Sequence, residues 1–102
     1  MGLLSRKFES ASHSKASKEL TVINKLGLHA RPSAMFVKTA SRFRADIWVE
    51  KEGEQVNGKS IMGLMMLAAG QGTRLLISAE GADAEVAIQE LEQLIDKRFD
   101  EE

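Results

Sequence analysis

Runs of alternating and of helical hydrophobic spacing follow one another along the chain and predict a mixed α and β fold. Short runs that are β-branched, or that alternate between apolar and polar residues, predict strands because successive strand side chains point to opposite faces. Four such runs occur, at residues 20–24, 45–50, 54–56 and 73–79. Apolar residues at helical spacing predict three helices, at residues 33–42, 61–68 and 83–97.

The last of these helices has the clearest apolar stripe. Asp83 precedes the stripe and is expected near the helix cap. The stripe consists of Ala84, Ala87, Ile88, Leu91, Leu94 and Ile95. The order βαββαβα predicts an α+β fold: a four-stranded antiparallel sheet with three helices on one face, because this arrangement buries each stripe economically.

The first 19 residues have a different composition from the rest of the chain. They are rich in Ser, Ala and Lys, and Leu3-Leu4 is their longest apolar run. Such a segment buries little surface, so residues 1–19 are predicted to be a polar, flexible N-terminal tail. Residues 20–102 are then predicted to form one small domain.

Composition excludes several classes of function. The 102 residues include no cysteine, which excludes disulfides and thiolate metal sites and agrees with a cytoplasmic location. The two histidines lie far apart in sequence, so a stable metal site is not expected. No cofactor is expected either. No apolar run approaches the roughly 20 residues that span a bilayer, so no membrane insertion is expected. The formal net charge of −1 argues against a partner made of nucleic acid.

The segment Gly27-Leu28-His29-Ala30-Arg31-Pro32-Ser33 is the strongest candidate for chemistry. Glycine permits a sharp turn, and proline fits best in the first turn of a helix, so His29 is expected at or next to a helix N-terminus. Free amides and the helix dipole attract an anion there, and Arg31 adds a guanidinium suited to phosphate. Imidazole is partly neutral and nucleophilic at neutral pH. A plain helix-end histidine is the alternative; Gly27, Arg31 and Pro32 favour chemistry, but spacing alone does not name the function.

Three segments together resemble the HPr family, the histidine-containing phosphocarrier proteins of bacterial phosphotransferase systems. Residues 27–32 resemble its active-site signature, and residues 57–65 (Asn-Gly-Lys-Ser-Ile-Met-Gly-Leu-Met) resemble its regulatory-serine segment. Gln71-Gly72-Thr73 and residues 77–81 resemble its last strand and turn. The segments stand in family order and spacing, and the likeness covers about residues 20 to 98.

This resemblance implies an open-faced β-sandwich and a phosphocarrier, which is not an enzyme with its own turnover. It implies that His29 accepts a phosphoryl group from phospho-enzyme I, at Nδ1, and passes it to a histidine of A-type domains of the system. Arg31 and the helix N-terminus formed by Ala30, Pro32 and Ser33 are expected to stabilise the phosphoryl oxygens. The protein is expected to be a monomer.

Ser60 has two compatible interpretations. Its position predicts an N-cap for the helix at residues 61–68. The resemblance implies a regulatory phosphosite for an HPr kinase/phosphorylase. A competing motif overlaps it, since residues 53–60 fit G-x-x-x-x-G-K-S, the phosphate-binding loop of nucleotide triphosphatases. A strand-like interior and the shortness of the chain disfavour a small nucleotide-binding protein.

The helix at residues 61–68 is too short to bury every face. Met62 and Met65 are predicted to form a partner interface, because methionine adapts to several partners. Ile61, Leu64 and Leu67 are predicted to lie in the core.

Two questions stay open at the level of sequence. One alternative function is a regulatory or adaptor module that binds a kinase or transcription factor and in which His29 is inert. Within the family, residues 60–63 resemble the sugar-transport branch, whereas residues 24–27, 64–67 and 99–102 resemble the nitrogen-related branch.

Overall fold

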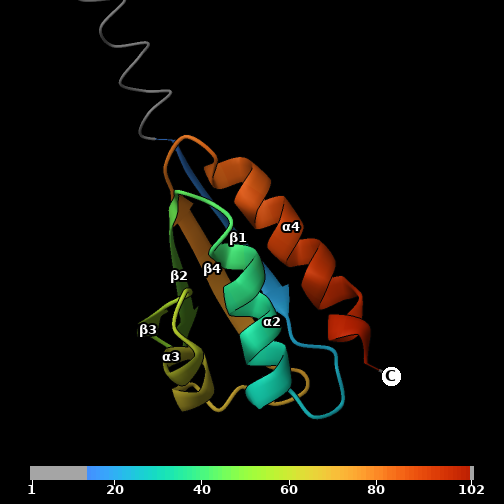
Figure 1. The fold of residues 1–102 in the computed structure, drawn as a ribbon. Coiled ribbons are helices and arrows are strands. Elements are labelled where there is room, and N and C mark those ends of the chain that lie inside the picture. The colour runs from blue at the N-terminus through green and yellow to red at the C-terminus, as the bar shows by residue number, and fades with distance from the viewer. Residues whose placement is uncertain (1–13, 102) are drawn as a thin grey trace, which may run out of the picture.

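The computed structural model describes residues 14–101, which form one sheet and the helices that cover one of its faces (Figure 1). The strands are β1 (Lys15–Thr21), β2 (Asp46–Lys51), β3 (Glu54–Asn57) and β4 (Arg74–Glu80). The helices are α2 (Ala30–Ala40), α3 (Ile61–Met66), α4 (Ala84–Asp96) and the short 3-10 helix η1 (Arg98–Asp100). None of the helices in this part of the chain is long and apolar enough to cross a membrane.

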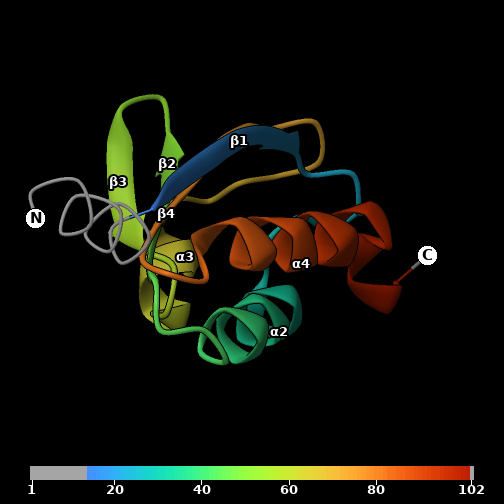
Figure 2. The ribbon, with the colours of Figure 1, turned by 90° about the horizontal axis from the view of Figure 1, so that it is seen from above.

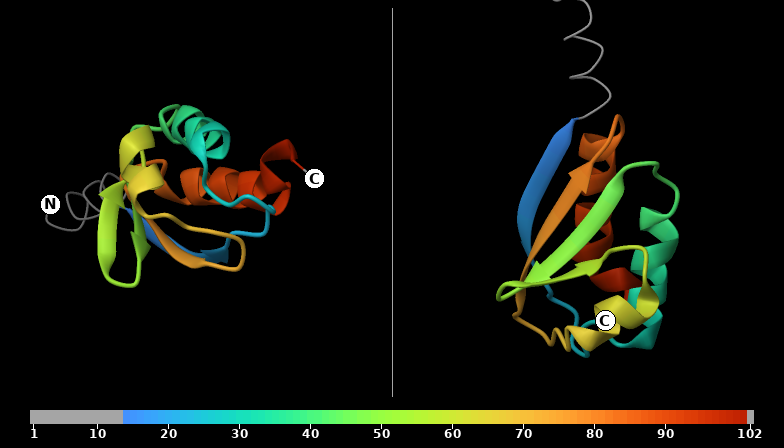
Figure 3. Two further views of the ribbon diagram at one scale, coloured as in Figure 1. Left: turned by 90° about the horizontal axis from the view of Figure 1, so that it is seen from below. Right: turned by 90° about the vertical axis from the view of Figure 1, so that its left-hand side faces the viewer.

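The sheet is antiparallel throughout and has the strand order β1-β4-β2-β3 (Figure 3). Leu20 pairs with Leu75 across β1 and β4, and Ile47 pairs with Ala79 across β2 and β4. These four side chains are buried, whereas Trp48, between two buried neighbours in β2, is partly exposed. The two-residue alternation of the sequence therefore sorts the side chains between a covered and an open face.

The helices supply the other half of the core. Helix α4 lies along β1 and β4, and α2 packs against α4 and α3 (Figure 2). The predicted stripe of α4 is buried in full, and Phe36 of α2 is completely buried. The predicted α+β fold, with four antiparallel strands and three main helices on one face, is confirmed.

Asp83 is at the predicted N-cap position of α4, but its side chain does not cap the helix. Its carboxylate instead accepts hydrogen bonds from the backbone amides of Arg44 and Ala45, both at 2.9 Å. The Arg44 amide is the main cause that lowers the pKa of Asp83; the Ala45 amide and the nearby Lys59 charge act in the same direction, and desolvation opposes them. The residue thus joins the start of α4 to the start of β2.

The predicted boundaries are right to within a few residues except for the first strand, predicted at residues 20–24. Strand β1 begins at Lys15, and residues 15–19, predicted as part of the tail, pair with β4. Their polar composition suits an edge strand that is open on one face. Residues 1–13 lie outside the described residues, so the flexible tail stays a prediction for that segment.

Candidate functional site

The loop before α2 is fixed by the close approach of two backbones. Gly27 has φ +71°, and a Cβ added to it would lie 2.4 Å from the carbonyl oxygen of Ala69. The next amide, of Leu28, donates to that same Ala69 oxygen at 2.9 Å. Glycine is required here both for its backbone conformation and for the absence of a side chain. The contact fixes the loop before His29 against the segment that follows α3.

His29 is the N-cap residue of α2, as predicted, and its side chain makes no capping hydrogen bond. The side chain is 36% exposed. Ala30 and Arg31 follow it in the exposed first turn. First-turn amides have no acceptor within their own helix, so this helix end presents free donors and the positive end of a dipole beside the imidazole.

Pro32 and Ser33 have structural roles in the same turn. Both are buried. The Ser33 hydroxyl donates to the carbonyl oxygen of Leu28 at 3.1 Å, and its amide donates to the carbonyl oxygen of His29 at 3.0 Å. Ser33 therefore holds the turn in place and has no donor left for a bound anion, which leaves Ala30 and Arg31 as the amides that face outward.

Arg31 is the nearest fixed positive charge along the chain. It is exposed, and within residues 14–101 its guanidinium forms no ion pair with a carboxylate. A guanidinium without an internal partner is available to an incoming phosphoryl group, for which its forked donors are well suited.

A carboxylate from the far end of the chain completes the site. Glu101 Oε2 lies 3.0 Å from His29 Nε2, and Glu101 Oε1 accepts a hydrogen bond from Asn24 Nδ2 at 3.1 Å. Asn24 is completely buried, and the same Nδ2 donates to the carbonyl oxygen of Gly27 at 2.8 Å. The carboxylate, the amide and the Gly27 turn therefore form one hydrogen-bonded unit around the imidazole.

Ser60 is the N-cap of α3, as predicted. Its hydroxyl accepts a hydrogen bond from the Gly63 amide at 2.9 Å. A Cβ on Gly63 would lie 3.2 Å from that hydroxyl oxygen, so the small residue lets the cap close tightly. The start of α3 is thus already satisfied by the protein itself.

The nucleotide-loop motif at residues 53–60 does not form a phosphate loop. Residues 54–57 form β3, whose backbone pairs with β2. The Gly58 amide donates to the carbonyl oxygen of Ile47 at 2.7 Å, and Lys59 Nζ donates to the carbonyl oxygen of Phe43 at 2.8 Å. The amides and the lysine that would surround a phosphate are engaged inside the fold, which overturns the nucleotide-binding alternative.

An apolar surface lies on α3, which packs against α2. We call it the α3 surface, and it consists of Ile61, Met62, Met65 and Met66. Met62 is 74% exposed, and Met65 is exposed as well. The prediction that Ile61 lies in the core is wrong, because it is 41% exposed at the first position of the helix, whereas Leu64 and Leu67 are buried as predicted. Sequence reasoning also missed Met66, since a six-residue helix buries only one narrow side.

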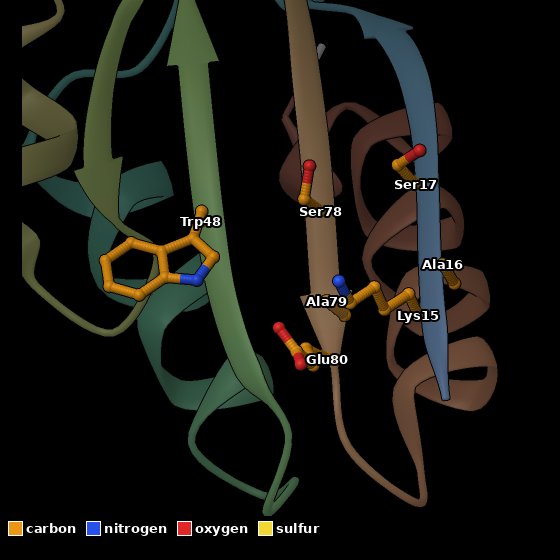
Figure 4. Close-up of a pocket in the computed structure, with 7 residues that line it drawn as sticks. All are labelled: Lys15, Ala16, Ser17, Trp48, Ser78, Ala79 and Glu80. Atoms are coloured by element: carbon orange, nitrogen blue, oxygen red, sulfur yellow. The ribbon is translucent and has the colours of Figure 1, made fainter. Parts of the chain in front are cut away.

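A shallow pocket lies on the open face of the sheet, away from the helices (Figure 4). Its side chains come from three neighbouring strands. They are Lys15, Ala16, Ser17, Trp48, Ser78, Ala79 and Glu80. No predicted site residue lines it. Across residues 14–101, no group of three His, Cys, Asp or Glu side chains is placed to hold a metal ion.

Comparison with known proteins identifies the family of this fold and site. The family described as PTS HPr component phosphorylation site matches residues 16–97. The chain belongs to the HPr family. It is 52% identical over 82 residues to the phosphocarrier protein HPr of Neisseria meningitidis serogroup A, which covers 80% of this chain and 92% of that one.

Two further relatives of the HPr family extend the comparison. The chain is 48% identical over 80 residues to the HPr-like protein Crh of Halalkalibacterium halodurans, covering 78% of this chain and 95% of the relative. The crystal structure of HPr-C-His from Thermoanaerobacter tengcongensis superimposes with a TM-score of 0.83 at 52% identity, covering 85% of this chain and 98% of that one. The match therefore includes almost the whole length of each relative.

The structure of this HPr family member brings some predicted site residues together and adds others. His29, Ala30 and Arg31 share one exposed helix end, and α3, which carries Ser60 and Met62, packs against that helix. Asn24 and Glu101 were missed. Glu101 reaches His29 only through tertiary packing, since the two are 72 residues apart. Asn24 bonds locally to Gly27, but its contact with Glu101 spans 77 residues. No local signal in the sequence marks such a pair.

Proposed function

We propose that His29 accepts a phosphoryl group from phospho-enzyme I and passes it to a histidine of the A-type domains of the phosphotransferase system. One observation carries this proposal: the imidazole sits, partly exposed, at a helix end whose first amides are uncapped. Ala30 and Arg31 follow His29 directly in this exposed turn, and Arg31 forms no ion pair within residues 14–101, so we assign these amides and the guanidinium to the phosphoryl oxygens. They supply fixed positive potential for the charge that spreads over the phosphoryl oxygens during transfer.

The α3 surface supports the same proposal as a docking site. Exposed methionines beside the helix that carries His29 suit a small apolar contact with several partners in turn. A carrier must leave its donor quickly, so a small, transient interface is required. We assign Met62 and Met65 to this interface, for enzyme I and for A-type domains alike, with the carrier acting as a monomer in the cytoplasm.

Regulation at Ser60 is the second part of the proposal. A phosphate on this hydroxyl would add about −1.5 to −2 charges at neutral pH, next to the α3 surface. It would also change a hydroxyl that now caps the Gly63 amide. We propose that an HPr kinase/phosphorylase places this phosphate and that it weakens docking of enzyme I through the negative charge.

The regulatory alternative, an adaptor with an inert His29, is favoured by the likeness to a protein named HPr-like protein Crh. It predicts partner binding through the α3 surface without phosphoryl transfer. The two functions therefore differ in one measurable product, a phosphohistidine.

The experiment incubates the full chain with phosphoenolpyruvate, Mg²⁺ and purified enzyme I, and follows its intact mass. We expect a gain of one phosphate that is labile in acid and stable in base, and its loss when an A-type domain is added. A chain that gains nothing, beside a control HPr that is labelled normally by the same and by a second enzyme I, supports the adaptor instead.

A further inference from the structure

The face of the sheet that the helices leave open carries apolar side chains beside the shallow pocket. Trp48 of β2 and Leu76 of β4 lie on this open face, and each is 38% exposed. Ser78 is the cross-strand neighbour of both Trp48 and Ser17, and the two small serine side chains leave a hollow next to the indole (Figure 4). An exposed indole beside a hollow offers apolar area that an occupant would remove from water.

The hollow suits one side chain better than a separate small molecule. Its volume is about 260 Å³. This is below the roughly 300–1,000 Å³ of usual small-molecule sites. An aromatic ring laid against the Trp48 indole would gain both buried area and a ring–ring contact. The occupant that fits is therefore a chain segment that carries an aromatic residue.

The open face is acidic around this hollow. Asp46 and Glu80 face each other across β2 and β4 at its edge. The outward-facing positions of β1, β2 and β4 hold four carboxylates against two basic side chains, so their formal charge is −2. These six residues are Lys15, Glu19, Asp46, Glu50, Arg74 and Glu80. A segment with a net positive charge would be attracted to this face.

The segment that precedes β1 has the matching chemistry. After Met1, residues 1–13 contain Leu3, Leu4 and Phe8 as large apolar residues. Two basic residues, at positions 6 and 7, stand against the single acidic residue Glu9, so the segment has a formal charge of +1. Composition predicts a tail that buries little surface, and these apolar side chains are the ones that it can bury.

The connection between this segment and the hollow is short. Strand β1 begins at Lys15, which itself lines the hollow, so residues 1–13 join the sheet at the edge of the hollow. Strands β1 and β2 are separated by β4, and two strand spacings are roughly 10 Å. Residues 9–13 span up to roughly 16–18 Å when extended, which is enough to bring Phe8 over Trp48.

We propose that residues 1–13 fold back over the open face of the sheet and that Phe8 packs on Trp48 in the hollow. The two basic residues of the segment then lie near the acidic edge of this face. The segment removes the indole from water and leaves the α3 surface free for partners. Strand β1 runs from the hollow to Thr21, and the loop to His29 follows that far end, so phosphoryl transfer is expected to be independent of this contact.

Trp48 is the one tryptophan of the chain, so its fluorescence reports this contact in the full-length protein. We expect the acrylamide quenching constant to be about twofold higher in Phe8→Ala than in the wild type, because a ring packed on the indole covers one of its faces. Val86→Ala is the matched control, since it removes an exposed apolar side chain from α4, on the covered side of the sheet. Its quenching is expected to equal that of the wild type.

A second measurement locates the segment, because the chain has no cysteine and a single Ser5→Cys change can carry a nitroxide label. We expect the label to broaden the Trp48 indole N–H and the Ser78 amide in ¹H–¹⁵N spectra, and not the amide of Ala30. Equal quenching in the wild type and Phe8→Ala, or no broadening at Trp48, would overturn the proposal. Protection of Trp48 that disappears on dilution would overturn it as well, since a second copy would then be the occupant.

Phosphorylation separates this contact from the proposed function. Phe8→Ala is expected to gain phosphate from enzyme I at the wild-type rate, since Phe8 lies outside the site around His29. Failure of the wild type to gain phosphate from any enzyme I would overturn the proposed function and leave the contact of Phe8 with Trp48 standing.

Discussion

Helices α2 and α3 pack against each other, yet their N-terminal ends are built in opposite ways. The start of α3 is closed by Ser60, whose hydroxyl accepts from the Gly63 amide. The start of α2 has an imidazole at the same position, and that side chain makes no capping bond. A capped end is stable by itself, whereas an uncapped end keeps donors that an anion can use. On the proposed function, the uncapped start of α2 takes the phosphoryl group from enzyme I, whereas the start of α3 is closed by its own cap.

Removing the imidazole of His29 is expected to have the largest effect on phosphoryl transfer. We expect His29→Gln to abolish phosphoryl acceptance, a loss of at least about 1,000-fold in rate, because the hydroxyl of Ser33 in the same turn is buried and hydrogen-bonded. The fold should be unchanged, since the ring is partly exposed and caps nothing. Phosphate incorporation and circular dichroism check the two parts. Incorporation at the wild-type rate would contradict the assignment of His29.

Gly27→Ala tests how the open end is positioned. The added Cβ would meet the Ala69 oxygen in a left-handed backbone, so we expect a loss of about 2–4 kcal/mol in unfolding free energy. Urea denaturation measures it. Gly53→Ala is the matched control, with φ +86° and nothing within 4 Å of the added carbon, and is expected to lose only about 1 kcal/mol. Equal losses in the two variants would mean that the contact with Ala69 is unimportant.

Ser60→Ala tests the closed end. Loss of an N-cap acceptor is expected to lower the unfolding free energy by about 1 kcal/mol. Ser60→Asp keeps an acceptor at the cap and should recover most of that stability. Thermal denaturation of the three proteins checks the order. If alanine were as stable as serine, the Gly63 contact would have no part in holding α3.

A third helix start, that of α4, gives an effect that is similar at neutral pH and fades in acid. The backbone amides of Arg44 and Ala45 lower the pKa of Asp83, so its stabilisation is full above the pKa of the unfolded chain and is lost as the pH falls through the lowered folded pKa. We expect Asp83→Asn to lose about 1 kcal/mol at neutral pH and to approach the wild type in acid. Denaturation across this pH range measures it, with Asp96→Asn on an exposed position of α4 as control. A difference that persists unchanged below about pH 3 would contradict the ionic account.

The sequence predicts well those features of the structure that depend on neighbouring residues. The α4 stripe, the cap at Ser60 and the helix start at His29 each depend on neighbours within one or two turns, and each was found. The prediction for the first strand begins too late, because the polar residues at its start form a strand only by pairing with β4. The prediction that Ile61 lies in the core is wrong, because the elements packed against α3 decide how much of that helix is buried. Glu101 was missed because only folding brings it to His29, and Asn24 was missed because its contact with Glu101 also depends on folding.

The central claim is that the uncapped end of α2, and not the capped end of α3, takes the phosphoryl group from enzyme I. The most direct test is to phosphorylate the full chain with phosphoenolpyruvate, Mg²⁺ and enzyme I, and to locate the phosphate by fragmentation mass spectrometry at neutral pH. We expect a single phosphate on His29 and none on Ser60. Phosphate on Ser60 or on His13, with His29 unmodified, would contradict it.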